Sequence, residues 1–287
     1  MRRVPGRILR VTMCATTIAA CAATAVAQQR PLVTEDPEVI GTGRMLAEAG
    51  VTYGRDIFFP ASGLRGNLLT LPSVGVSIGL GSIVELQLDG AFANRLSITH
   101  REEAPLSGQL RVDGDRTTGV DDFVIATKLR LASETQRRPA IGLRLATKLP
   151  TSSNEVGIGL DTTDFLSTLL VGKTVRSVRV VGNLGLGILG DPTDGSRQND
   201  VLMLGASVAR ALTEDFEVVG ELQGQADLRS GRTPPGTESR GVLRFGVRLT
   251  RGTVRMDAAL VTGLTVRDPS WGFTMGATYV WDAFVIP

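Results

Sequence analysis

The chain is poor in the residues that build disulfide frameworks and zinc centres. It has two cysteines, Cys14 and Cys21, and one histidine among 287 residues. Both cysteines lie within the first 27 residues, which have the features of a secretory leader. A mature chain without cysteine excludes a disulfide framework, and one histidine excludes a zinc site built from several histidines. We therefore expect no bound metal and no cofactor.

Long apolar runs are also missing. No stretch reaches 18 uninterrupted apolar residues, so no helix is expected to span a bilayer. The chain is nevertheless 42% hydrophobic and contains 34 glycines. A membrane β-barrel has this profile, because each of its strands presents only every second side chain to lipid.

The first 27 residues predict a signal peptide. Four arginines precede an apolar stretch that begins at Val11 and ends with Ala25-Val26-Ala27, a small-x-small cleavage site. Cleavage there leaves a mature chain of about 260 residues, enough for one large β domain. A second interpretation takes Ile18-Ala19-Ala20-Cys21 as a lipoprotein cleavage box, with Cys21 as the lipidated residue.

The basic character of the chain belongs to this leader. The whole sequence has 31 Lys+Arg and 29 Asp+Glu. Removal of the four leader arginines leaves 27 basic residues against 29 acidic ones, a net charge of −2. Nothing in the remaining charge balance indicates nucleic-acid binding, and no nucleic acid is expected as a partner.

Period-2 alternation between apolar and polar side chains runs through the mature chain. Around 216–228, Phe216, Val218 and Leu222 fall on one face and Glu217 and Glu221 on the other. One segment, around 163–174, is apolar on both faces and its sides cannot be assigned. Twelve strands are predicted at about 44–53, 68–80, 83–98, 120–131, 140–149, 163–174, 178–189, 201–211, 216–228, 241–250, 253–263 and 271–281.

The connections between these strands alternate between short and long. Gly81-Ser82, Arg176-Ser177 and Arg251-Gly252 are short, whereas Thr99 to Gly119 is long, and Gly54 to Asn67 is also predicted as a long loop. This pattern predicts an antiparallel up-and-down transmembrane β-barrel over residues 44–287, with both termini on the short-turn, periplasmic side of the outer membrane. A soluble β-sandwich is the alternative, but it has no reason to sort its connections by length.

Charged residues on the polar faces are candidates for the lining of the lumen. If the strands around 216–228 and 241–250 form a hairpin, one register pairs Glu221 with Arg244 and Glu217 with Arg248. Charges inside a barrel need partners or water, so these side chains either brace the wall or filter solutes. The candidate lumen-lining residues are Glu85, Asp89, Lys128, Arg130, Arg144, Lys148, Glu217, Glu221, Arg244 and Arg248.

Two further expectations concern the lumen. On the third and fourth predicted strands, Glu85 and Asp89 are expected to approach Lys128 and Arg130. Twelve strands are intermediate between a side-chain-filled barrel and an open pore, which predicts a narrow or partly plugged passage. Residues 28–43 form a periplasmic N-terminal segment that is long enough to enter the lumen as a small plug.

Three motifs suggest other chemistry. His100 could act as the base for Ser97 in a barrel-embedded lipid or ester hydrolase, with Glu102 or Glu103 as the acid; a solvated loop histidine is the other interpretation. An acidic cluster in the second long loop, Asp113, Asp115, Asp121 and Asp122, could bind calcium, although the ligand spacing matches no EF-hand loop. A solvated surface cluster is the other interpretation. Glycines at 185, 187 and 190 spell G-x-G-x-x-G, but they lie within a strand rather than before a helix, so no dinucleotide site is expected.

Several segments resemble a known family. These are RPLVTEDPEVIGTGR (30–44), GVDDFVIATKLRL (119–131), PAIGLRLATKLPT (139–151), TTDFLSTLLVGK (162–173) and VVGNLGLGILGDP (180–192). They are similar to the outer-membrane family named for a MetA pathway of phenol degradation. The resemblance implies an outer-membrane barrel that passes small, aromatic or hydrophobic molecules, and it gives no catalytic residues to carry over.

The partners implied are outer-membrane lipid, small-molecule solutes and the outer-membrane assembly machinery. Barrels of this kind usually end on an aromatic residue that the assembly machinery recognises. Here the chain continues past Trp281 to Pro287. Either Trp281 or Phe284 fills that role, or the terminal recognition differs.

Overall fold

The computed structural model describes residues 30–284, and the predicted leader and its cleavage site lie outside this range. The described chain is almost entirely β-structure, with two short 3-10 turns, η1 (Ser107–Gln109) and η2 (Asn154–Val156). Its strands are β1 (Arg44–Phe59), β2 (Leu64–Gly79), β3 (Val84–Ala91), β4 (Asn94–Arg101), β5 (Arg116–Gly119), β6 (Val124–Ala132), β7 (Ala140–Lys148), β8 (Asp164–Val175), β9 (Val178–Gly190), β10 (Gln198–Ala211), β11 (Phe216–Asp227), β12 (Arg240–Arg251), β13 (Val254–Gly263) and β14 (Trp271–Asp282).

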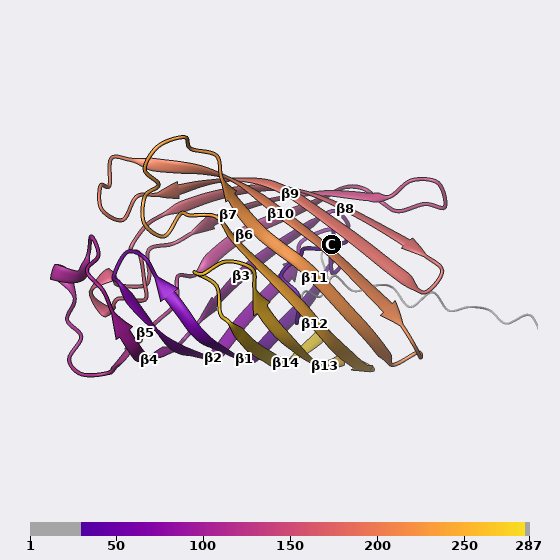
Figure 1. Ribbon diagram of the computed structural model, residues 1–287. Helices are drawn as coiled ribbons and strands as arrows, with labels where there is room; N and C mark the ends of the chain where they lie inside the picture. Colours follow the sequence, from indigo (N-terminus) through magenta and orange to yellow (C-terminus); the bar gives the residue numbers. More distant parts are fainter. Residues whose placement is uncertain (1–29, 285–287) are drawn as a thin grey trace, which may run out of the picture.

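The strands close into a barrel (Figure 1). Each pairs antiparallel with its neighbours, and the ring runs β1-β14-β13-β12-β11-β10-β9-β8-β7-β6-β3-β2 before β2 pairs with β1 again. Twelve of the strand segments therefore form the wall, and the predicted 12-stranded antiparallel barrel is confirmed. β4 and β5 continue the sheet beyond the wall at one end.

This extension corrects two predicted strands. The strand expected at 83–98 divides after Ala91, so β2 pairs with β3 through 73–79 and with β4 through 64–70. The strand expected at 120–131 starts only at Val124, as β6, which pairs with β3. β5 pairs with β4 and lies in the loop that was predicted at 99–119. Leu71 and Phe92 keep hydrogen bonds across the break, so the sheet bends here without separating. We call β4, β5 and the facing part of β2 the sheet extension.

One predicted loop is wrong. Residues 54–67 were expected to form a long loop, but β1 runs to Phe59 and β2 starts at Leu64, leaving only 60–63 as a connection. The turn-like composition around Gly54 is instead accommodated by a bulge, at which the β1–β2 register shifts between Gly54 and Ile57 and Asp56 takes a positive φ of 59°. The hairpin therefore rises above the wall as extended strands.

The two ends of the barrel differ in their connections. At one end, which we call the short-turn rim, the links include 80–83, 176–177 and 252–253, and the start of β1 pairs with the end of β14. The other end, the long-loop rim, carries the long links 102–115, 149–163 and 228–239. At that rim, Leu64, Leu96 and Ile98 form a buried cluster against Leu110 and Ile158, which packs two of the long loops onto the sheet extension.

The outer surface is apolar over the height of the wall. Side chains that alternate outward remain exposed, such as Leu186, Phe245 and Leu260, as expected of a face that meets lipid. The structure also assigns the sides of β8, which the sequence left open: Phe165 is exposed on the outer face, and Leu170 is fully buried on the inner face. Within the described residues, no helix is long and apolar enough to cross a membrane.

All four Trp and Tyr residues of the chain lie on two adjacent strands, β1 and β14. Tyr53 contacts Trp271 near the long-loop rim, with ring centroids 5.7 Å apart, and Tyr279 stacks on Trp281 near the short-turn rim at 5.3 Å. The two aromatic pairs are ten residues apart along β14. With a rise of about 3.4 Å per residue and a tilt of about 45°, this separation corresponds to roughly 25 Å of membrane thickness.

Candidate functional site

Residues 30–43 lie inside the barrel, and we call them the lumen segment. Leu32, Val39 and Ile40 are buried, and Ile40 packs against Leu46 and Val280 of the wall. Backbone N–H groups of the segment donate to side chains on several strands. The N–H of Glu35 donates to the Asn183 side chain at 2.7 Å, and that of Ile40 donates to the Glu85 carboxylate at 2.8 Å. Side chains of the wall, rather than the strand ladder, therefore hold this segment.

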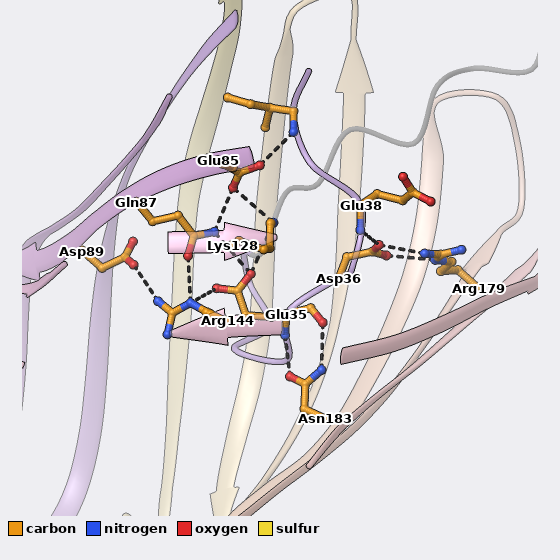
Figure 2. A network of polar contacts seen from close by, with 11 residues as sticks. Glu35, Asp36, Glu38, Glu85, Gln87, Asp89, Lys128, Arg144, Arg179 and Asn183 are labelled. Carbon is orange, nitrogen blue, oxygen red and sulfur yellow. Dashed lines mark hydrogen bonds and ion pairs between the residues drawn. The ribbon is translucent and has the colours of Figure 1, made fainter. Parts of the chain in front are cut away.

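The carboxylate of Glu35 is the centre of the contacts (Figure 2). Arg144 on β7 lies 2.9 Å from one of its oxygens, and Lys128 on β6 lies 3.6 Å from the other. Lys128 is also paired with Glu85 at 3.1 Å, and the side chains of both are completely buried. Arg144 continues to Asp89 at 3.3 Å. Charges this deep are stable only when each has partners, and here the lumen segment supplies one of them.

A second carboxylate of the segment links it to a short turn. Asp36 accepts two hydrogen bonds from the Arg179 guanidinium on β9, at 2.9 and 2.7 Å (Figure 2). Arg179 also pairs with Glu134 in the turn between β6 and β7. Desolvation alone would raise the pKa of Glu134, but the N–H of Thr174 and the cations Lys173 and Arg179 outweigh it, so this pKa lies below its ordinary value. Glu134 is therefore ionised and forms a second ion pair with the Arg179 guanidinium.

One predicted set of neighbours needs correction. Glu85 lies opposite Lys128 in the β3–β6 register, as expected. Asp89 and Arg130, however, do not join that pair: Asp89 binds Arg144, and Arg130 binds Glu38 of the lumen segment at 2.8 Å. Part of the expected wall bracing is therefore replaced by contacts to the segment.

The β11–β12 pairs are present in the predicted register. Glu221 lies opposite Arg244 with a separation of 2.6 Å, and Glu217 lies opposite Arg248 at 3.8 Å. These residues also hold the segment. Glu221 accepts hydrogen bonds from the N–H groups of Val33 and Thr34 and from the Thr34 hydroxyl, and Arg248 donates to the carbonyl of Arg30 at 2.9 Å.

Lys148, the remaining candidate, lies towards the long-loop rim. It pairs with Asp164 at 2.7 Å and with Asp122 at 3.3 Å, and Asp122 accepts from the backbone and hydroxyl of Ser152 in a long loop. Asp122, one of the four aspartates considered as calcium ligands, is thus a partner of lysine. Among the residues that the structure describes, no group of three or more His, Cys, Asp or Glu side chains is placed to hold a metal ion.

Two hollows flank the first half of the lumen segment. One, of about 410 Å³, is lined by Arg30, Glu35, Asp89 and Arg144 among others. The second, of about 370 Å³, is lined by apolar residues that include Ile57, Phe59, Leu68 and Val242 and by arginines that include Arg240 and Arg244. Each is the size of a small-molecule site. The lumen is therefore partly filled, with room for small solutes beside the segment.

His100 lies on β4 of the sheet extension, opposite Arg65 and outside the lumen. Its side chain is exposed. No hydrogen bond or ion pair among the described residues joins it to Ser97, Glu102 or Glu103. The structure does not assemble the triad that the hydrolase hypothesis requires.

The sequence analysis missed the carboxylates that complete the network, namely Glu35, Asp36 and Glu38. The charge count of the candidate lumen set indicated that acidic partners were missing, because the set has six cations and four carboxylates. Buried cations without partners are costly, so nearby acids were needed. The run Thr34 to Glu38 supplies three, and it lies in the one segment that was expected to enter the barrel.

Two solved outer-membrane proteins have a similar barrel. The structure is similar to the COG4313 outer membrane channel from Pseudomonas putida F1, with a TM-score of 0.61 and 13% identity over 86% of this chain and 98% of that one. It is also similar to the NanC porin, with a TM-score of 0.51 and 10% identity over 82% of this chain and 98% of that one. At these identities the likeness shows the fold.

No protein of curated function matches the sequence. A family model does match, over residues 28–281, which includes the lumen segment and nearly the whole barrel. The chain therefore belongs to the family described as "Putative MetA-pathway of phenol degradation".

Proposed function

We propose that this protein is a passive channel for small molecules across the outer membrane, with its short-turn rim and both termini in the periplasm. One observation carries the proposal: the lumen segment is held by wall side chains and not by the strand ladder. It can therefore move without breaking the barrel. The apolar outer face and the fold shared with two channel proteins support the location.

The substrates that we propose are small aromatic or otherwise hydrophobic molecules. The second hollow supports this choice, because apolar Phe59 and Leu68 line it together with Arg240 and Arg244. Such a surface accommodates a flat apolar ring, while the guanidinium groups attract its π face or a phenolic oxygen. The family description, which names phenol degradation, agrees with this chemistry.

We infer that transport is passive and that the protein is not an enzyme. The sequence has no ATP-binding loop or energy-coupling motif. The isolated position of His100 supports the second inference, since nothing among its described contacts activates a nucleophile.

A closed structural barrel is the second candidate function. The observation in its favour is the same dense network, because every candidate lumen residue has a partner in the wall or the segment. The two functions differ in solute passage. A closed barrel passes none, whereas a channel with a displaceable segment passes molecules that fit beside it.

Planar-bilayer recording of the purified mature protein tests the proposal, together with uptake of phenol by proteoliposomes. We expect discrete single-channel currents and phenol uptake faster than in protein-free liposomes. Neither current nor uptake, in a sample that spectroscopy shows to be folded, would favour the closed barrel.

A further inference from the structure

The outer face of the sheet extension carries a cluster of arginines. Arg95 on β4 alternates with buried Leu96, and Arg116 on β5 alternates with buried Thr117, so both arginines are exposed on the outer side. The β4–β5 register sets Arg95 opposite Thr118 and Ser97 opposite Arg116. The two arginines are therefore diagonal neighbours, a spacing that long side chains can bridge.

Two further arginines extend the cluster across the neighbouring strands. Arg65 on β2 lies opposite His100 of β4, and Arg55 on β1 lies opposite Trp271 of β14. We call Arg55, Arg65, Arg95 and Arg116 the arginine patch.

The arginine patch lies beside the aromatic pair Tyr53 and Trp271 near the long-loop rim. Tyr53 is paired in register with Leu69, and Leu69 is paired with Arg95, so Arg95 lies in the row that contains Tyr53. Arg55 and Arg116 lie one row farther from the wall. Because Trp and Tyr side chains of membrane proteins lie at the level of the lipid headgroups, the patch lies at the height of the headgroup phosphates.

Most of the patch is not neutralised by the protein. Arg65 pairs with Asp56 at 3.5 Å and lies over the Phe58 ring, whereas Arg55, Arg95 and Arg116 make no ion pair with any described residue. The opposite wall differs at the same rim. There, one row of outward residues consists of Phe165, Ile188 and Asp200 and carries no cation. That row therefore has no counterpart of the arginine patch.

We propose that the arginine patch binds the phosphate groups of lipid A, the phosphorylated glycolipid anchor of lipopolysaccharide in the outer leaflet. A guanidinium group matches phosphate geometry with two parallel hydrogen bonds, and several cations spread over adjacent strands suit a lipid that carries two phosphates. Its acyl chains would lie along the apolar wall below Tyr53 and Leu69. The inference rests on the proposed orientation, with the long-loop rim outside the cell.

Native mass spectrometry of the purified full-length mature protein in detergent tests this site. The protein is titrated with bisphosphorylated lipid A, with the dephosphorylated glycolipid and with phosphatidylglycerol. The test variant is Arg95→Gln with Arg116→Gln. The control is Arg137→Gln with Arg210→Gln, two exposed arginines towards the short-turn rim. A heat-modifiable shift in gel mobility shows that each variant is folded.

We expect the wild type to bind lipid A at least about tenfold more tightly than the patch variant binds it. The wild type should also bind lipid A at least about tenfold more tightly than it binds the dephosphorylated glycolipid. The control variant should bind lipid A like the wild type. Equal binding by the patch variant would overturn the proposal. So would equal affinity of the wild type for dephosphorylated lipid A or phosphatidylglycerol, a comparison that needs no variant.

The result is separable from channel activity. The same preparations are recorded in planar bilayers that contain no lipopolysaccharide. Lipid A binding without current would contradict the proposed channel and leave this site standing, whereas current without selective lipid A binding would do the reverse.

Discussion

Replacement of Glu35 by Gln tests how the lumen segment is held. The change removes the charge that faces Arg144 at 2.9 Å and Lys128 at 3.6 Å. The wall keeps its own pairs, because Lys128 remains 3.1 Å from Glu85 and Arg144 remains 3.3 Å from Asp89. The variant therefore weakens the attachment of the segment and leaves the barrel folded.

The magnitude follows from these contacts. Hydrogen bonds to charged groups contribute about 1.5–3 kcal/mol each, and the glutamine can still accept one weaker bond from Arg144. A net loss of about 3 kcal/mol shifts the equilibrium between held and released segment by roughly a hundredfold. We expect a correspondingly higher open probability of single channels in planar bilayers.

The matched control is Glu214→Gln, which removes an exposed carboxylate in a short turn. It should conduct like the wild type. A Glu35→Gln variant with unchanged open probability and conductance would refute the role of this contact. A double-mutant cycle with Arg144→Met separates the pairwise contribution from other effects of the substitutions, and we expect strong coupling between the two.

Three further predictions test the packing, the membrane position and the absence of enzyme activity. A Cβ at Gly79 would clash with the carbonyl oxygen of Gly41, whereas one at Gly81 meets nothing within 4 Å. Gly79→Ala should therefore destabilise the barrel by about 1–3 kcal/mol in thermal unfolding, and a stability equal to that of Gly81→Ala would contradict this packing. Fluorescence of Trp271 and Trp281 should be quenched by brominated lipids, more strongly when the bromines lie near the headgroup; unquenched emission would contradict the membrane-facing assignment of β14. His100→Ala should leave any hydrolysis of an ester reporter unchanged, and loss of such activity would revive the hydrolase hypothesis.

The strands were predictable because a barrel wall imposes a period of two on every strand. The same regularity predicted the register of Glu221 with Arg244, since one hairpin alignment satisfies two ion pairs at once. Alternation could not assign the faces of the segment around 163–174, because Leu166 and Leu170 are apolar residues that face inward. Leu170 is completely buried, and Leu166 lines the hollow of about 410 Å³ beside the lumen segment.

The sheet extension was less predictable. The composition around Gly54 and Asp56 is typical of a loop, but a bulge absorbs it within continuing strands. The contacts of the lumen segment were harder still, because they join residues as distant in sequence as Glu35 and Asn183. An irregular segment has no periodicity that would reveal its partners, and its acidic run was the one feature of the sequence that indicated contact with the wall cations.

The account depends most on the claim that the passage for solutes widens when the lumen segment moves from the wall. A Cβ at Gly205 would lie 3.3 Å from the Thr34 hydroxyl, so Thr34→Cys with Gly205→Cys places two thiols within disulfide range in a mature chain expected to have no other cysteine. We predict that the oxidised variant conducts less than either single-cysteine variant in planar bilayers, and that dithiothreitol restores its current. An oxidised protein, with its disulfide verified by mass, that conducts as well as the reduced one would contradict the account.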